Sequence, residues 1–76
     1  MRRKTPKIVL TFATTSDAMA LEAAARDRGL PGRMIPIPSE ISAGCGLAWC
    51  IPVEEWGAFE RAPEVRYEGK FEVELY

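Results

Sequence analysis

One short run of this 76-residue chain combines residue types that could do chemistry, Ser42-Ala43-Gly44-Cys45-Gly46. Glycine on each side of Cys45 removes the neighbouring side chains, so the sulfur can be approached and backbone N–H groups can turn toward an anion. The nucleophile is the thiolate, and such N–H groups together with a nearby cation lower the pKa of a thiol. The run therefore predicts a reactive cysteine at Cys45, in a loop supported by Ser42, Gly44 and Gly46.

A purely structural interpretation of the same run stays open. Cys45 would then be a small, half-buried residue of a tight turn, whose flanking glycines are needed because their φ angles are positive. Arg33, which precedes the second predicted strand, is the candidate cation for the reactive interpretation. Composition alone does not decide between the two interpretations.

Cys50 is the other cysteine of the chain and lies five positions after Cys45. In a continuous strand, five steps of ~3.3 Å put the two Cα atoms roughly 16 Å apart, whereas a disulfide needs less than about 7 Å. An internal disulfide would therefore require a sharp bend at Gly46. Alternation along the strand places Cys50 with Ala48 on the sheet face away from the helices. We interpret Cys50 as a small residue of a central strand, with a role as a second thiol as the alternative.

The composition argues against several classes of function. The formal net charge is −1 and the chain has no histidine, which removes the commonest general base and the commonest metal ligand. Two cysteines without histidine are too few ligands for a structural zinc ion in one chain, so we predict no metal site and no cofactor. A near-neutral chain also lacks the basic surface that binding to nucleic acid requires.

Basic residues gather before the first predicted strand, so residues 1–6 are predicted to be a solvated tail and residues 7–76 a single domain. A domain this short buries a smaller share of its surface than a larger domain does, and self-association as a homodimer is one source of stability that the sequence permits. The apolar run 8–13 is too short for a signal peptide and is interrupted at 14–17. No segment approaches the ~20 apolar residues of a transmembrane helix, so we predict a cytoplasmic protein with reduced thiols.

Hydropathy patterns and capping residues divide the domain into six elements. Alternation and β-branched residues predict strands, whereas Thr15 or Ser16 can cap a helix that stops at Gly29. Pro36 and Pro38 cannot donate ladder hydrogen bonds, which places their strand at a sheet edge. The predicted elements are a strand at 7–12, a helix from the cap to 28, strands at 34–37 and 46–51, a helix at 53–60, and a strand at 65–75.

This order predicts an α+β fold of the ferredoxin-like βαββαβ type, a four-stranded antiparallel sheet with two helices on one face. In that fold the first and third strands are central, and the second and fourth are edges. The first helix is expected to bury Ala18, Leu21 and Ala25, and the last strand to bury the apolar face that alternates with its charges. Three aromatic residues are expected to pack in the core rather than to stack on bases: Trp49, Trp56 and Phe59.

The run Pro38-Ser39-Glu40-Ile41-Ser42-Ala43-Gly44-Cys45-Gly46-Leu47-Ala48 resembles the signature of the putative selenium/sulfur carrier protein-like family. The members of this family are small bacterial domains. The resemblance extends through nearly the whole chain after the basic tail, including Ile35-Pro36-Ile37-Pro38 and Tyr67-Glu68-Gly69. Its most specific part is the Ile-Ser-x-x-Cys-Gly-Leu-Ala core.

The resemblance implies that Cys45 holds sulfur or selenium as a persulfide or its selenium counterpart. The protein would then be a carrier rather than a free-standing enzyme. Its partners would be a donor, such as a pyridoxal-phosphate-dependent desulfurase, and an acceptor enzyme. Ser39 and Cys50 stand where much of the family has basic residues. If those basic residues steady an anionic carrier group, this member is a weaker carrier or takes a different cargo.

Two other functions fit the same residues. The domain would be a non-catalytic interaction module if the glycine–cysteine turn serves geometry alone, because fold does not decide function. It would be a thiol redox sensor if peroxide modifies Cys45 reversibly.

Overall fold

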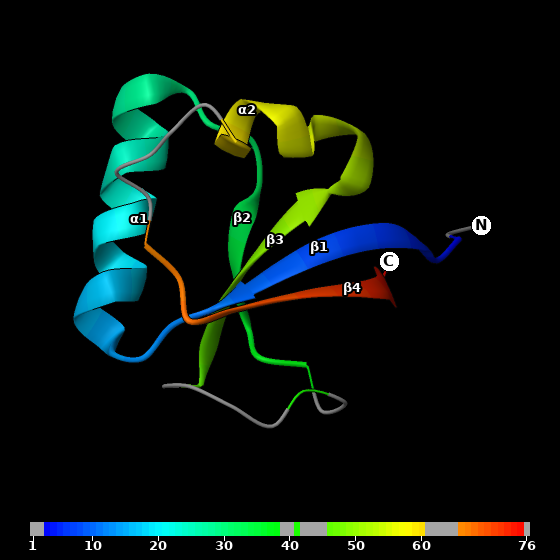
Figure 1. Ribbon diagram of the computed structural model, residues 1–76, viewed down its shortest axis with the longest axis horizontal. Helices are drawn as coiled ribbons and strands as arrows, with labels where there is room; N and C mark the ends of the chain where they lie inside the picture. Colours follow the sequence, from blue (N-terminus) through cyan, green and yellow to red (C-terminus); the bar gives the residue numbers. More distant parts are fainter. Residues whose placement is uncertain (1–2, 39–40, 42–45, 61–65, 76) are drawn as a thin grey trace.

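Four antiparallel strands and two helices make up the fold in the computed structural model, which describes residues 3–38, 41, 46–60 and 66–75 (Figure 1). The predicted α+β class is confirmed. The sheet has the strand order β2-β3-β1-β4, so the first and third strands are central and the other two are edges, as predicted. The elements in chain order are β1 (Thr5–Thr11), α1 (Thr15–Arg28), β2 (Arg33–Pro36), β3 (Leu47–Pro52), the 3₁₀ helix η1 (Val53–Glu55), α2 (Trp56–Glu60) and β4 (Gly69–Leu75).

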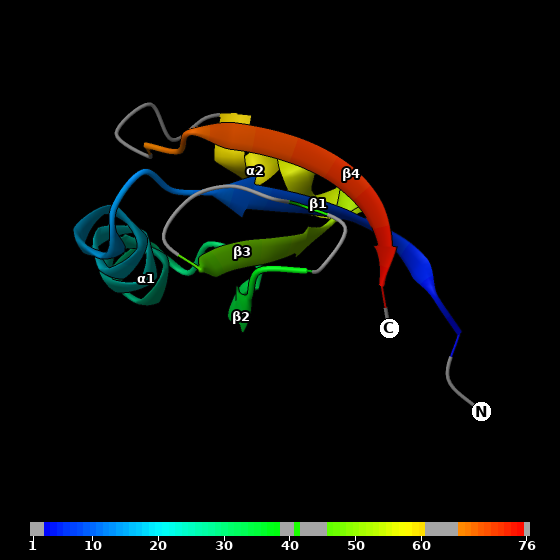
Figure 2. The same cartoon turned by 90° about the horizontal axis from the view of Figure 1, so that it is seen from below.

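Pairing with the edge strands sets the lengths of the central strands. β1 starts at Thr5 rather than at residue 7, because Thr5 and Pro6 pair with the last residues of β4. β2 starts at Arg33 and ends at Pro36, one residue earlier at each end than predicted. The sheet twists strongly, and β4 curves along its edge (Figure 2).

The first helix begins one residue earlier than the predicted caps allow. Thr14 is the N-cap: its backbone is extended, and its Oγ1 accepts a hydrogen bond from the Asp17 N–H at 3.1 Å. Thr15 and Ser16 do not fill this position, although threonine and serine both cap helices well. The helix stops as predicted at Gly29, which has φ 69° and donates its N–H to the Ala25 carbonyl.

The predicted second helix is divided in two. Pro52 precedes η1 and makes no side-chain cap hydrogen bond, and the Trp56 N–H donates to the Val53 carbonyl in the tighter 3₁₀ pattern. α2 then runs for only five residues. A start without a side-chain cap, and with Gly57 in its first turn, explains why an eight-residue α-helix does not form.

Both helices pack on the same face of the sheet, as predicted. One cluster joins α1 and α2 to the central strands, and its buried members are Ile8, Leu10, Phe12, Ala18, Leu21, Ala25, Trp49, Ile51 and Phe59. The predicted buried face of α1 and the core positions of Trp49 and Phe59 are therefore confirmed. The Trp49 indole also donates to the Pro31 carbonyl at 3.0 Å, which ties β3 to the turn after α1.

Trp56 is half-buried at the margin of this cluster rather than inside it. Its ring stacks on Phe59 with centroids 5.9 Å apart and meets the edge of Tyr67 at 6.3 Å. The Lys70 ammonium lies 4.6 Å from the centre of the Trp56 ring. These contacts connect α2 to the start of β4.

The opposite, helix-free face carries a second, smaller cluster. Its buried members are Val9, Ile41 and Ala48, with Ile35, Ile37, Val73 and Leu75 partly buried around them. The prediction of a buried apolar face on the last strand is wrong for β4, where Phe71 is 40% exposed and the neighbouring apolar positions are half-buried. The reason is that Phe71 lies opposite Val9, so this side of β4 faces the sheet surface that no helix covers.

Candidate functional site

The predicted reactive loop is described only at its last residue. Ser42, Gly44 and Cys45 lie outside the described residues. Gly46 is exposed and has φ 93°, and a Cβ built on it would meet no atom within 4 Å. This positive φ angle is what the purely structural interpretation of the run expects of a flanking glycine. Open space adjoins the residue that follows the predicted nucleophile.

Hydrogen bonds and burial anchor the connection between β2 and β3 at three residues. The Ile37 N–H donates to the Gly46 carbonyl at 3.0 Å, and the Ile41 N–H donates to the Pro38 carbonyl at 3.0 Å. The Ile41 side chain is buried against Val9 and Ala48 on the helix-free face. The start, an intermediate point and the end of the connection thus have defined positions on the sheet.

Cys50 lies on the helix-free face, toward the end of β3 that is farther from Gly46. It lies opposite Val9 on β1 and Arg33 on β2, and directly opposed residues of antiparallel strands share a face. Its predicted position on the face away from the helices is therefore confirmed. Cys50 is a free cysteine and only 4% exposed.

The surroundings of Cys50 favour its neutral thiol. Burial raises the pKa of the Cys50 thiol, and the positive charges of Lys7 and Arg33 oppose this rise by favouring the thiolate. Burial has the larger effect, so Cys50 is a poor nucleophile at neutral pH. This environment supports its interpretation as a small residue of a central strand over its interpretation as a second thiol.

Arg33, the predicted cation for Cys45, lies opposite Cys50 in the register of β2 and β3. It lies three positions along β2 from Pro36, whose partner Leu47 is next to Gly46. Three strand residues span roughly 10 Å. That Arg33 also serves Cys45 stays a prediction, since Cys45 is outside the described residues.

A hollow of about 310 Å³ opens at Cys50, between the ends of three strands and η1. Its lining residues are Lys7, Gly32, Arg33, Cys50, Pro52 and Glu55. Sequence reasoning did not connect Lys7 to this site. The available signal was a lysine two positions before Val9, on the same side of an otherwise apolar strand.

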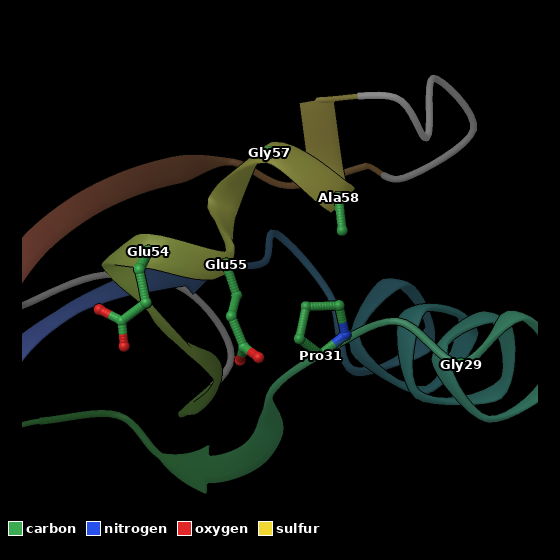
Figure 3. Close-up of a pocket in the computed structure, with 6 residues that line it drawn as sticks. All are labelled: Gly29, Pro31, Glu54, Glu55, Gly57 and Ala58. Carbon is green, nitrogen blue, oxygen red and sulfur yellow. The ribbon is translucent and has the colours of Figure 1, made fainter.

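A second hollow of about 410 Å³ lies between the turn after α1 and the helices η1 and α2. Figure 3 shows the Glu55 side chain extending toward Pro31 from η1. Of the described residues that line it, Glu54 and Glu55 alone are charged, and both stand in the first turn of η1. Carboxylates at this position interact favourably with the positive end of a helix. None of the described residues that line this hollow is a nucleophile.

The described residues contain no group of three or more histidine, cysteine, aspartate or glutamate side chains that could hold a metal ion. None of their helices is both long enough and apolar enough to cross a membrane.

Comparison with known families shows which family the chain belongs to. The family described as Putative Se/S carrier protein-like matches residues 7–68. This chain belongs to that family. No curated protein and no solved structure matches it.

The part of the chain that matches the Se/S carrier protein-like family includes every candidate site residue. It starts at Lys7, contains both cysteines and Arg33, and ends at Glu68. β4 follows the matched range. The family match thus covers the reactive loop, the Cys50 hollow and both helices.

Proposed function

We propose that this protein is a small carrier that holds sulfur or selenium on Cys45, as a persulfide or its selenium counterpart, and delivers it to an acceptor enzyme. Membership of the Se/S carrier protein-like family supports a carrier role. The structural observation that carries the proposal is that Gly46, next to Cys45, is exposed and has open space around its Cα. The supporting loop residues in this proposal are Ser42, Gly44 and Gly46.

The chemistry requires only thiol exchange. The Cys45 thiolate attacks the outer sulfur of a persulfide on the donor, a new S–S bond forms, and the donor thiolate leaves. A nucleophile of the acceptor then attacks the outer sulfur, and the Cys45 thiolate leaves. No external oxidant is consumed. A carrier needs no general base of its own, which suits a chain without histidine.

The proposed setting is a bacterial cytoplasm, where thiols stay reduced and a pyridoxal-phosphate-dependent desulfurase supplies the persulfide. The proposed architecture is the ferredoxin-like one. The order β2-β3-β1-β4, with β1 and β3 central and both helices on one face, supports it. This fold serves many functions, so the carrier proposal depends on the loop and the family, not on the fold.

Mass spectrometry tests the carrier proposal. The protein is incubated with a cysteine desulfurase and cysteine, without reductant, and the site of added sulfur is mapped. We expect the mass of one sulfur atom on Cys45, an unmodified Cys50, and no gain in the Cys45→Ser variant. Cys50→Ala is the matched control and should load like the unmodified chain. Equal labelling of both cysteines, or no labelling, would reject the proposal.

A second candidate function is a non-catalytic interaction module. Phe71, 40% exposed, favours it because it lies on the same side of β4 as Val73 and Leu75 on the helix-free face, and contiguous apolar surface is typical of docking sites. Under this alternative, Cys45→Ser leaves partner binding and cellular sulfur and selenium metabolism unchanged. Under the carrier proposal, the same substitution abolishes transfer.

A further inference from the structure

The hollow at Cys50 collects positive charge around a buried thiol. Cys50 lies on the central strand β3, and the two neighbouring strands each contribute one cation, Lys7 from β1 and Arg33 from β2. Neighbouring strands are ~4.8 Å apart, so the two cations approach the hollow from opposite sides. A group seated over Cys50 would lie between them.

The cations of this hollow are not neutralised within the described part of the chain. No ion pair joins Lys7 or Arg33 to a carboxylate there, although Glu55 also lines the hollow. Two positive charges against one negative charge leave an excess of +1. Lys7 is half-buried, and Cys50 has almost no exposed surface. Partial burial weakens solvent screening at Lys7, whereas Arg33 and Glu55 are exposed, so Lys7 is the charge of the hollow that attracts an anion more strongly than an exposed charge would.

We propose that the Cys50 hollow binds a small oxyanion, such as sulfate or selenate, between Lys7 and Arg33. A tetrahedral anion presents oxygens in several directions and can meet both cations at once, whereas a single carboxylate is satisfied by the Arg33 guanidinium alone. No aromatic side chain lines the described part of the hollow, so stacking with a nucleotide base does not contribute. Gly32, with φ 109°, lines the hollow beside Arg33 without a side chain, and the Trp49 indole and the Cys50 carbonyl oxygen fill the space that a Cβ would need.

Protonation of Cys50 is part of this site. A neutral thiol at the floor does not repel an anion, whereas a thiolate would. Burial holds the thiol neutral at pH 7, against the influence of Lys7 and Arg33. A bound anion offsets those two cations, so it raises the pKa of Cys50 further. By linkage, oxyanion affinity falls as pH rises and Cys50 ionises.

This inference goes beyond the proposed carrier function and does not depend on it. The experiment uses the Cys45→Ser variant, in which no carrier group can form. Failure of the oxyanion site therefore leaves the sulfur-loading experiment unaffected, and failure of loading leaves this one unaffected.

The test is a titration followed by the backbone amide signals of Gly32, Arg33, Cys50 and Glu55. Sulfate or selenate replaces chloride at constant ionic strength and pH 7. We expect saturable shifts confined to these amides. Lys7→Met and Arg33→Met should each weaken the affinity roughly tenfold, since each removes a charge-assisted contact. Arg66→Met, which removes an exposed cation outside the hollow, should change nothing.

One variant is expected to gain affinity, which no folding defect can imitate. Glu55→Gln removes the opposing carboxylate and should tighten oxyanion binding several-fold. Shifts that do not saturate, or an unchanged affinity in Glu55→Gln and Arg33→Met, would overturn the site. An equal response to acetate would overturn the preference for a tetrahedral oxyanion and indicate a site that also binds carboxylates.

Discussion

The two cysteines of this chain, only five positions apart, are predicted to stand in opposite environments. Cys45 follows a glycine and precedes Gly46, whose surroundings are open. Cys50 is 4% exposed on a central strand, and burial raises the pKa of its thiol. Thiol reactivity depends on both the thiolate fraction and access, so the two environments predict different rates.

Alkylation rates measure this difference directly. With iodoacetamide at pH 7, Cys45 of the folded protein should react at least tenfold faster than Cys50, a factor expected from the pKa and access differences together. In Cys45→Ser the fast phase should vanish, and in Cys50→Ala it should persist. Denaturant should remove the protection of Cys50. An equally fast reaction of the folded Cys45→Ser variant would contradict the prediction.

Gly32 is required by both its backbone and its neighbours. Its φ angle is 109°, and a Cβ there would collide with the Trp49 indole and the Cys50 carbonyl oxygen. Gly32→Ala should therefore lower the free energy of unfolding by about 2–4 kcal/mol, from backbone strain plus overpacking. Gly57→Ala is the control, because the added methyl meets nothing and alanine suits the helix better, so stability should rise slightly. Urea denaturation measures both, and equal effects would refute the steric explanation.

Thr11 carries a buried hydroxyl with no hydrogen-bond partner among the described residues. Thr11→Val replaces this hydroxyl with a methyl of similar shape and should stabilise the protein by about 1 kcal/mol. Thr11→Ser, which keeps the hydroxyl and loses the methyl, should destabilise it by about 1 kcal/mol. Thermal denaturation distinguishes the two. Loss of stability in Thr11→Val would mean that the hydroxyl is satisfied in solution.

At the scale of elements, the spacing of apolar side chains correctly predicted the buried face of α1. Ala18, Leu21 and Ala25 recur at helical spacing and are buried. Pro36 and Pro38 correctly predicted an edge position for β2, although only Pro36 lies within the strand. Boundaries were less predictable, because three consecutive residues could cap α1 with similar chemistry and only the folded backbone selects Thr14.

Contacts across strands could not be read from the sequence. Alternation in β4 correctly predicted two different faces, but it does not tell whether a helix covers the apolar one. Lys7 and Arg33 are 26 positions apart in the chain. The register of three strands brings both of them to Cys50, and that register could not be predicted. Arg33 was identified as a cation for a thiol, yet the register brings it to Cys50.

The cap of α1 makes a prediction at this scale. Thr14→Ala removes the acceptor of the Asp17 N–H and should cost about 1 kcal/mol of unfolding free energy. Thr14→Ser keeps the acceptor and should cost much less. Thr15→Ala is the matched control, since Thr15 lies inside the helix and is exposed. A larger loss in Thr15→Ala than in Thr14→Ala would assign the cap to another residue.

At the scale of the whole molecule, the sheet holds Cys50 in a central strand, whereas Cys45 belongs to the sequence between β2 and β3. The helices cover one face, and the smaller cluster with Ile41 covers part of the other. The domain therefore couples the ionisation of Cys50 to folding, because unfolding returns this thiol to water. That coupling can be measured through the pH dependence of stability.

The sign of the pH dependence of stability follows from the direction of the pKa shift of Cys50. Burial raises the pKa of Cys50 in the folded state above its unfolded value, which for cysteine is about 8.5. Below that pH both states hold the proton, and the full stabilisation is present. As pH rises above it, the unfolded chain loses the proton first, so stability falls until the folded-state pKa is passed. Urea denaturation of Cys45→Ser should show this fall from pH ~8 upward.

The control is Cys45→Ser/Cys50→Ala, which keeps every other titrating group. The difference in unfolding free energy between the two proteins should be constant below pH ~7.5 and should shift steadily in favour of the alanine variant at higher pH. Replacing Arg33 with methionine in the first protein should enlarge the shift, because one of the two charges that favour the thiolate is removed. A difference that stays constant to pH 10 would mean that solvent reaches Cys50 in the folded protein, and the hollow would then have to bind anions beside an ionisable thiol.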